Sequence, residues 1–376
     1  MIKILTIVGT RPQIIKSFSL SKEIRSNFNN LINEIIVHTG QHYDEKMSEI
    51  FYEEINLTLP KYEFKLDPKH KISPLFQIIF NLEEIVKKEK PNAMLVYGDT
   101  NSTFAGAYIA SKLNIKLLHV EAGLRSYDKN MPEELNRIFT DHLSSILFCP
   151  TKSSIKNLEI EGISHSKGSC SMTNKKVYLS GDVMYDNLLH NVTKKNKNIL
   201  NRYKLKNFCL LTFHRKSNTN NKNRLKKIVD SLVKFSEKFK KTLFFPIHPR
   251  TKKYFKLFFG NNKYNYLLSH KFFKIIDPIS YTEMISIIKN CDLVITDSGG
   301  IQKEAYLLEK PSIIIRNETE WIEILENGSS VLWDLRFETF VKSYEELLNN
   351  KLKFQKLFGN GNSANFICDK IIDEIR

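Results

Sequence analysis

One segment of the chain runs from an apolar strand through a turn with two adjacent glycines into a helix-forming stretch. The apolar part is 293–295, the turn is Asp297-Ser298-Gly299-Gly300, and Glu304 lies in the stretch that follows. A strand that leads into a helix is the repeating unit of parallel α/β sheets, because a crossover must reach the next parallel strand. Glycines let backbone N–H groups approach an anion at the positive helix end, and Ser298 can cap that helix. The segment predicts a phosphate-binding turn, with Glu304 placed for a ribose hydroxyl; an ordinary strand-to-helix turn remains the alternative.

A second strand with a candidate anion site after it begins the chain. Residues 2–8 form an apolar run that ends in Gly9-Thr10-Arg11-Pro12, and Lys16 follows about one helical turn later. Arg11 is a fork-shaped donor at the carboxyl end of this predicted strand, and so suits a phosphate. The motif is not the three-glycine dinucleotide fingerprint, so it indicates no nicotinamide or flavin cofactor.

Size and cysteine usage bound the class of protein. The chain has 376 residues, of which 41% are apolar and 11% aromatic, enough for two ordinary domain cores. No apolar run approaches the roughly 20 residues of a membrane helix, and the chain enters a strand at once, without a signal peptide. The five cysteines are scattered and lack CxxC spacing. These features predict a reduced, cytoplasmic protein without a zinc site or a membrane partner.

The formal net charge of +16 raises the question of a nucleic-acid partner. The lysines are dispersed through stretches that are also rich in asparagine, such as 194–198 and 220–224. No basic segment alternates with stacking aromatic residues as in single-strand binding modules. We therefore expect no nucleic-acid partner, although a basic surface would attract an anionic sugar diphosphate.

Apolar strand-like runs alternate with amphipathic stretches along the whole chain. The first series of runs is 2–8, 35–37, 94–97, 116–120, 146–148 and 177–179, and the second is 208–211, 243–247, 273–276, 293–295 and 312–315. This alternation predicts an α/β protein with two Rossmann-like domains that face each other across a cleft. The predicted domains are 1–185, which carries the candidate acid-base residues, and 186–356, which carries the predicted phosphate-binding turn. Residues 357–376 are expected to form a C-terminal helix that packs back on the first domain.

Ionisable residues follow several predicted strands where each strand ends. Asp99, Glu121, His214 and His248 all occupy such positions. Because ligands bind at the carboxyl ends of parallel strands, these residues form a candidate acid-base constellation around one cleft. Asp99 can instead be a helix cap, His248 a packing residue, and the turn at His214 a plain surface turn. Glu121, directly after a strand, is expected to be partly buried.

Residues 131–137 have the pattern of a helix start. A proline stands at 132 and two glutamates follow it, and acidic residues in a first turn are favoured by the helix dipole. Glu133 and Arg137 lie one helical turn apart and can orient each other. The spacing alone does not decide between a helix start and an active-site pair.

Seven short motifs occur along nearly the whole chain. They are Gly9-Thr10-Arg11-Pro12, His38-Thr39-Gly40-Gln41-His42, Gly98-Asp99-Thr100, His119-Val120-Glu121-Ala122-Gly123-Leu124-Arg125, Pro132-Glu133-Glu134, His214-Arg215 and Asp297-Ser298-Gly299-Gly300-Ile301-Gln302-Lys303-Glu304-Ala305. In this combination the chain resembles the non-hydrolysing UDP-N-acetylglucosamine 2-epimerase family. Gln13, with 181–184, 248–251 and 318–321, looks more like the branch that acts on UDP-2,3-diacetamido-2,3-dideoxy-glucuronate. Ser217 departs from the family, which usually has glutamate there.

The resemblance implies a GT-B type fold, a homodimer, and interconversion of the gluco and manno forms of a UDP-2-acetamido sugar without a metal or redox cofactor. The family is understood to eliminate UDP, giving a 2-acetamidoglycal, and to add it back after reprotonation on the other face, for surface polysaccharide biosynthesis. By motif position, the acid-base carboxylates are Asp99, Glu121 and Glu133, and the active-site histidine is His214. The UDP-binding positions are Arg11, Ser298, Gly299, Gly300 and Glu304, and further candidates for UDP-sugar binding are Lys16, Arg137 and His248.

Other functional classes share parts of this pattern. A GT-B glycosyltransferase has the same fold and UDP site, but three carboxylates fit proton transfer better. A hydrolysing epimerase would release free sugar and UDP, and a silent sugar-nucleotide binder would do neither.

Overall fold

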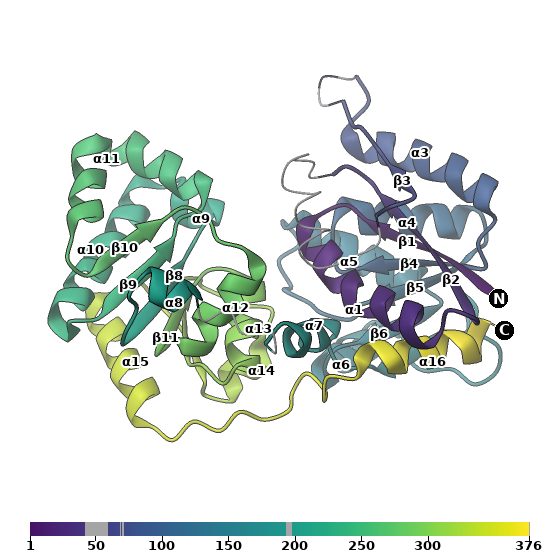
Figure 1. Cartoon of the computed structure of the whole chain (residues 1–376). Coiled ribbons are helices and arrows are strands. Elements are labelled where there is room, and N and C mark those ends of the chain that lie inside the picture. The colour runs from purple at the N-terminus through teal and green to yellow at the C-terminus, as the bar shows by residue number, and fades with distance from the viewer. Residues whose placement is uncertain (42–58, 68, 70, 193–197, 376) are drawn as a thin grey trace. The chain divides into compact units, whose positions relative to one another are not determined.

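The computed structural model consists of two compact units, each built on one parallel sheet, and describes residues 1–41, 59–67, 69, 71–192 and 198–375 (Figure 1). Unit 1 comprises Met1–Asn187 and Lys356–Arg376, and unit 2 comprises Leu188–Gln355. The chain thus leaves unit 1 once and returns to it at its end. His42, the last residue of the motif that begins at His38, lies outside the described residues.

Unit 1 has a seven-stranded sheet in the order β3-β2-β1-β4-β5-β6-β7. Its strands are β1 (Ile2–Val8), β2 (Ile32–His38), β3 (Tyr62–Glu63), β4 (Ala93–Tyr97), β5 (Lys116–Val120), β6 (Ile146–Cys149) and β7 (Lys176–Leu179). Its helices are α1 (Arg11–Asn27), α3 (Pro74–Glu89), α4 (Asn101–Lys112), α5 (Pro132–Leu143), α6 (Lys152–Ile160), the first half of α7 (Val183–Val192 in all, the second half belonging to unit 2) and α16 (Ser363–Ile375). Every residue of β4 is buried, as expected for a parallel strand covered on both faces.

Unit 2 has a six-stranded sheet in the order β10-β9-β8-β11-β12-β13. Its strands are β8 (Phe208–Thr212), β9 (Thr242–Pro246), β10 (Phe273–Ile276), β11 (Leu293–Thr296), β12 (Ser312–Ile314) and β13 (Ser330–Leu332). Its helices are α8 (Asn198–Arg202), α9 (Lys216–Thr219), α10 (Lys222–Phe239), α11 (Pro249–Ser269), α12 (Tyr281–Asn290), α13 (Gly299–Leu307), α14 (Ile322–Glu326) and α15 (Phe337–Asn349). Successive residues of β8 face opposite sides, so Leu211 joins one apolar core and Leu210 the other.

Once each sheet is numbered from its own first strand, both have the strand order 3-2-1-4-5-6, and unit 1 adds a seventh strand, β7, at the edge. In each, the chain starts at a central strand, moves outward to one edge and then returns to build the other half, which is the doubly wound Rossmann arrangement. The point where the direction reverses lies between β1 and β4 in unit 1, and between β8 and β11 in unit 2. Ligands of such sheets bind outside the carboxyl ends of the strands at this point, so the turns after these strands are where function is expected.

The expected strands are all present, and the expectation of two Rossmann-like halves is confirmed. The two additional strands, β3 and β13, have only two and three residues. The C-terminal helix α16 packs along α1, and its N-terminus is held because the Ala364 N–H donates to Asp186 Oδ2 at 2.7 Å.

Candidate active site

The turn after β5 carries a glutamate in an unusual backbone conformation. Glu121 has φ +71°, a left-handed region that side chains other than glycine seldom adopt, and its side chain is 7% exposed. Its own N–H and that of Ala122 both donate to the carbonyl oxygen of Phe148 in β6, each at 3.1 Å. Such strained positions persist only where neighbouring contacts fix them, and they cluster at functional sites.

Two cations and two carboxylates meet at this edge of the unit 1 sheet. Lys16 of α1 forms an ion pair with Glu121, and Arg137 Nη2 of α5 lies 2.7 Å from Asp99 Oδ2 and 3.7 Å from Glu121 Oε1. Burial alone would lower the pKa of Arg137, but Asp99 and Glu121 outweigh it, so the pKa lies above its usual value. The structure therefore groups four of the sequence-predicted residues. Asp99 keeps 29% of its side chain exposed, so a substrate can reach this group.

The two neighbouring glutamates on α5 have different environments. Glu133 is exposed in the first turn, whereas Glu134 is buried and accepts hydrogen bonds from Ser126 N–H at 2.8 Å and Tyr127 N–H at 3.0 Å. Among the described residues, the ion pairs of Arg137 are with Asp99 and Glu121, so the pairing of Arg137 with Glu133 that the helical spacing suggested is wrong. Glu134 holds a loop in place, and Glu133 is the glutamate that solvent reaches.

Asp99 is not the helix cap that the sequence left open. Thr100 is the N-cap of α4, where its hydroxyl accepts from the Thr103 N–H at 3.3 Å. Asp99 is consequently available to Arg137.

The N-terminal motif places Arg11 in the exposed first turn of α1, after the N-cap Thr10. Gln13, two residues later, is buried, and its side chain forms hydrogen bonds inside unit 1. Its Oε1 accepts from the Gly9 N–H at 2.9 Å, and its Nε2 donates to Tyr97 O and Thr103 Oγ1, both at 2.9 Å. Gln13 therefore links the ends of β1 and β4 through its side-chain hydrogen bonds.

In unit 2 a fully buried aspartate joins the turn after β8 to the turn after β11. Asp297 accepts from the backbone N–H of His214 at 3.0 Å and of Arg215 at 2.9 Å, and from Asn218 Nδ2 at 2.9 Å. Arg215 Nε also donates to the Asp297 carbonyl oxygen at 3.0 Å. The carboxylate thus sets the position of His214 beside the start of α13.

His214 and His248 lie face to face on this side of unit 2. Their ring centroids are 4.9 Å apart and the planes are inclined by 23°. His214 Nδ1 is 3.6 Å from Asp297 Oδ1, with 42% of the histidine side chain exposed, whereas His248 caps α11. Burial lowers the pKa of His248, and the neighbouring His214 and Arg250 lower it further. The partly exposed His214 side chain therefore lies beside the turn after β11.

Each of the two glycines in that turn is accommodated for a different physical reason. Ser298 caps α13 by accepting from the Ile301 N–H at 3.5 Å, so both functions considered for it remain compatible. A Cβ at Gly299 would lie 2.1 Å from Glu320 Oε1, whereas at Gly300 its nearest neighbour would be Ser298 Oγ at 3.9 Å. Gly299 therefore makes room for Glu320, whereas the space beside Gly300 is open, and its use by an anion stays a prediction. Glu304 is buried on the same helix, 5% exposed.

Glu320 and Lys303 add charges around α13 that sequence reasoning missed. Arg316 Nη1 lies 2.6 Å from Glu320 Oε2; burial alone would raise the pKa of Glu320, but Arg316 outweighs it and lowers it. Lys303 is 2% exposed, and its Nζ lies 4.5 Å from the centroid of the Trp321 ring, a cation–π contact. Lys303 and Trp321 are far apart along the chain, and Arg316 and Glu320 lie in a non-helical segment, so neither contact has a periodic signal in the sequence. Asp297, in contrast, follows a predicted strand, as Asp99 and Glu121 do.

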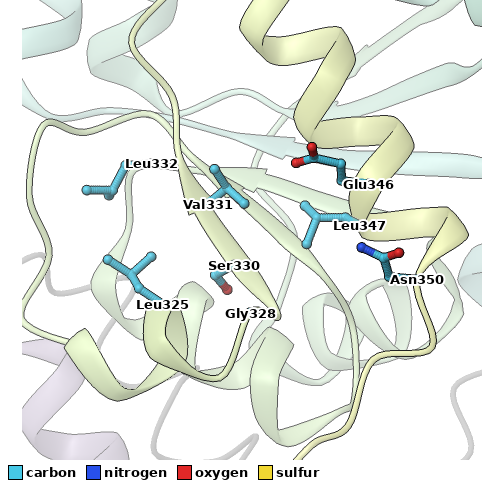
Figure 2. Close-up of a pocket in the computed structure, with 8 residues that line it drawn as sticks. All are labelled: Leu325, Gly328, Ser330, Val331, Leu332, Glu346, Leu347 and Asn350. Atoms are coloured by element: carbon cyan, nitrogen blue, oxygen red, sulfur yellow. The ribbon is translucent and has the colours of Figure 1, made fainter.

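A pocket on unit 2 lies away from these strand-end turns. It is lined by Leu325, Gly328, Ser330, Val331, Leu332, Glu346, Leu347 and Asn350, at the edge strand β13 and helix α15 (Figure 2). Its charged residue is a glutamate, which would repel a diphosphate, and none of the sequence-predicted residues lines it. No helix in the described part of the chain is long and apolar enough to cross a bilayer.

Comparison with known proteins agrees with the motifs. A profile of the family described as UDP-N-acetylglucosamine 2-epimerase matches residues 25–372. The UDP-N-acetylglucosamine 2-epimerase of Methanocaldococcus jannaschii is 42% identical, with 96% of each chain covered. The UDP-2,3-diacetamido-2,3-dideoxy-D-glucuronate 2-epimerase of Pseudomonas aeruginosa is 38% identical, with 98% of each chain covered.

A solved structure extends the similarity to the fold. The M. jannaschii enzyme in complex with UDP-GlcNAc and UDP has a TM-score of 0.86 and 40% identity, covering 98% of this chain and 99% of its own. The fold class, two Rossmann-like domains of the GT-B type, is thereby confirmed. The chain belongs to the UDP-N-acetylglucosamine 2-epimerase family.

Proposed function

We propose that this chain is a non-hydrolysing 2-epimerase that interconverts the gluco and manno forms of a UDP-2-acetamido sugar, of the UDP-GlcNAc to UDP-ManNAc type. The observation that carries the proposal is the strand-end group in unit 1, where Glu121, in a strained conformation, is paired with Lys16 and neighbours Arg137. A structural ion pair needs no strained backbone, whereas a proton-transfer group must be aimed at its substrate. Membership of the family supplies the reaction class.

The chemistry explains why more than one carboxylate is needed. C2 of the sugar is not adjacent to a carbonyl group, so its hydrogen is not acidic. A base removes the C2 proton while the C1–O bond breaks, and its electron pair leaves with UDP; the product is a 2-acetamidoglycal. An acid then delivers a proton to the other face of C2, and UDP adds back at C1. Asp99, Glu121 and Glu133 supply the proton-transfer groups in this proposal, and either face can belong to any of them.

The UDP moiety is assigned to exposed or strand-end groups. Ser298 and Gly300 offer hydrogen-bond donors at the start of α13, where the helix dipole favours phosphate. His214 lies beside that turn because Asp297 holds its backbone, and His248 stacks on it. Arg11 is the exposed guanidinium at the start of α1. Gly299 and Glu304 complete the assigned set, and no cofactor is required by the scheme.

The same reaction on UDP-2,3-diacetamido-2,3-dideoxy-glucuronate is the second candidate, and the P. aeruginosa relative favours it. Part of the sequence argument for that branch weakens in the structure. Gln13 is buried and forms a hydrogen bond to the end of β4. Residues 181–184 are also buried, and the Asp182 N–H donates to Phe358 O at 3.0 Å. These positions are buried in unit 1, which weakens them as support for that branch. We therefore keep the acetamido-glucose substrate as the first candidate.

One assay separates these functions. The full chain is incubated in heavy water with UDP-GlcNAc, and in parallel with the diacetamido uronate, and the products are examined for manno sugar, deuterium at C2 and free UDP. We expect manno product with deuterium at C2 and little net UDP. Stoichiometric UDP release would instead assign a hydrolysing epimerase, and sugar transfer to an added acceptor without C2 exchange would assign a glycosyltransferase. Absence of exchange with both substrates would contradict the epimerase proposal.

A homodimer is part of the proposal, and unit 1 offers a surface for it. Helices α3, α4 and α5 pack side by side and leave large apolar side chains exposed, including Phe76, Phe80, Tyr108 and Phe139. Adjacent exposed apolar residues on a soluble protein often mark a protein interface. Light scattering is expected to give twice the chain mass for the wild type and a lower mass for Phe80→Glu. A monomeric wild type would contradict the dimer. Location in the cytoplasm and service to a surface polysaccharide stay predictions.

A further inference from the structure

Helix α5 carries a fully buried carboxylate one turn after Arg137. Asp141 has no solvent-exposed surface, and its Oδ1 lies 2.7 Å from His119 Nδ1. The Gly123 N–H donates to its Oδ2 at 3.1 Å. His119 precedes Glu121 by two residues and Gly123 follows it by two. The carboxylate of Asp141 therefore holds the chain on both sides of Glu121.

His119 extends this contact to the other carboxylate of the group. Its Nε2 lies 2.7 Å from the carbonyl oxygen of Gly98, the residue before Asp99. A carbonyl oxygen only accepts, so Nε2 donates. The ring is fully buried, and hydrogen bonds in such surroundings are costly to lose. From the same helix, Asn136 Nδ2 donates to the carbonyl oxygen of Asp99 at 3.1 Å.

Asp141 is held as an anion by its neighbours. Burial alone would raise its pKa, but His119 and Arg125 outweigh it, and the pKa lies below its usual value. Arg125 Nη1 donates to Asp141 Oδ2 at 2.7 Å, while its Nε donates to Glu161 Oε1 at 2.6 Å. Arg125 thus binds two carboxylates. Asp141, the inner one, also contacts the turns at the strand ends, whereas Glu161, the outer one on the turn after α6, does not.

We propose that Asp141 is a positioning residue for the proton-transfer reaction, acting through His119 and Gly123. It fixes the backbone that carries Asp99 and Glu121, and because it shares α5 with Arg137 it fixes both carboxylates relative to that guanidinium. The proposal rests on the 2-epimerase function proposed above. A misplacement of about 1 Å at reacting groups lowers rates about 10²-fold, so a small shift of these turns is enough to be measured.

The central test compares two carboxylates that hold the same arginine. Asp141→Asn keeps the shape but removes the charge that binds His119, Gly123 and Arg125. Glu161→Gln, the matched control, removes the outer charge from Arg125 and leaves the contacts of His119 and Gly123 intact. We expect Asp141→Asn to lower kcat about 10²-fold with little change in KM, since the substrate is still bound but the groups are misplaced. Glu161→Gln is expected to lower thermal stability while kcat stays near that of the wild type.

A second pair of variants keeps the proposal testable if Asp141→Asn does not fold. His119→Asn retains a donor near the position of Nδ1, and so can still bind Asp141, but it loses the bond to Gly98. His119→Gln retains a donor near Nε2 and loses the bond to Asp141. Both are expected to lower kcat at least about tenfold with a native circular dichroism spectrum. His119 links Asp141 to the turn at Gly98 through both ring nitrogens, so a variant that keeps only one of the two hydrogen bonds should not retain the wild-type kcat.

The outcomes are distinct. Folded His119 variants with wild-type kcat would overturn the positioning role, as would a folded Asp141→Asn with wild-type kcat. A loss of kcat in Glu161→Gln as large as in Asp141→Asn would also overturn it, because the effect would then belong to Arg125 and general stability. The wild-type exchange assay is run first; a wild type without C2 exchange contradicts the proposed function itself, whereas an active wild type with unaffected variants contradicts the positioning role alone.

Discussion

The imidazole rings of His214 and His248 stack with their centroids 4.9 Å apart. His248 also accepts the Arg250 N–H at its Nδ1, at 3.1 Å, so its neutral ring carries the proton on Nε2. Burial lowers the pKa of His248, and His214 and Arg250 lower it further, while Asp297 acts in the opposite direction. A proton added at Nδ1 would end the cap on α11. Protonation of His248 at low pH is therefore expected to weaken both its stacking on His214 and its cap on α11.

The free energy of unfolding is expected to fall as pH drops below the ordinary histidine value of 6.5. Between the lowered pKa of His248 in the folded chain and 6.5, the unfolded chain binds a proton at this position and the folded chain does not, so acid favours unfolding. His248→Asn keeps an acceptor for the Arg250 N–H and does not titrate. The loss of stability between about pH 7.5 and about pH 5, measured by urea unfolding, should be smaller in this variant than in the wild type.

His248→Ala serves as the control for the cap. It removes both the titrating group and the acceptor, so it should also lose less stability in acid, but start about 1 kcal/mol less stable at neutral pH. If wild type and His248→Asn lost the same amount in acid, the acid sensitivity would belong to other groups, such as buried His38, whose pKa is lowered to about 4 by burial.

Replacement of Glu121 by glutamine should abolish turnover and leave UDP affinity nearly unchanged. The amide keeps the shape of the carboxylate, but it neither accepts nor delivers a proton, and general acid-base groups contribute at least about 10²-fold to a rate. The residues assigned to UDP in unit 2 are untouched. The measurements are C2 deuterium exchange with the UDP-sugar and calorimetric titration with UDP.

Glu89→Gln offers a matched control for this change. Glu89 is also a buried glutamate of unit 1 paired with lysines, Lys61 at 2.7 Å and Lys3 at 3.7 Å, but it lies on α3. Its replacement should cost stability and leave exchange intact. A folded Glu121→Gln protein that binds the UDP-sugar much more weakly but still exchanges at the wild-type rate when saturated would assign Glu121 to recognition.

The sequence predicted the two sheets because their strands are apolar runs at regular spacing, and a buried parallel strand must be such a run. It missed β3 and β13, which are short and only partly buried, whereas the equally short β12 is fully buried and lies in the apolar run 312–315. The group of Asp99, Glu121, Lys16 and Arg137 was within reach, since strand ends in one sheet meet at one edge. The ion-pair partners of Arg137 could not be predicted in the same way. The helical spacing pointed to Glu133, but Arg137 pairs with Asp99 and Glu121, which follow other strands. Asp141 lies in the last turn of α5 and follows no predicted strand, so the strand-end argument did not reach it.

Gln13→Glu should lower stability without changing sugar preference. The amide Nε2 donates to Tyr97 O and Thr103 Oγ1, and a carboxylate would place an acceptor against the carbonyl oxygen of Tyr97. An unsatisfied buried acceptor costs about 1–3 kcal/mol. The ratio of kcat/KM for UDP-GlcNAc to that for the diacetamido uronate should equal the wild-type ratio. A changed ratio would give Gln13 a direct part in selecting the sugar.

The two glycines at the start of α13 should respond in opposite ways to alanine. In Gly299→Ala the new Cβ would lie 2.1 Å from Glu320 Oε1, and Glu320 is held by Arg316, so the change should lower the melting temperature and disturb the turn. Gly300→Ala meets its nearest neighbour only at 3.9 Å, and alanine in a helix is favoured over glycine by about 0.5–1 kcal/mol, so stability should rise. If Gly300 keeps room for phosphate, the same variant should nevertheless bind UDP more weakly in calorimetric titration. A more stable Gly300→Ala with unchanged UDP affinity would show that the helix start works without a bare backbone at this position, and the phosphate would then have to be held by side chains.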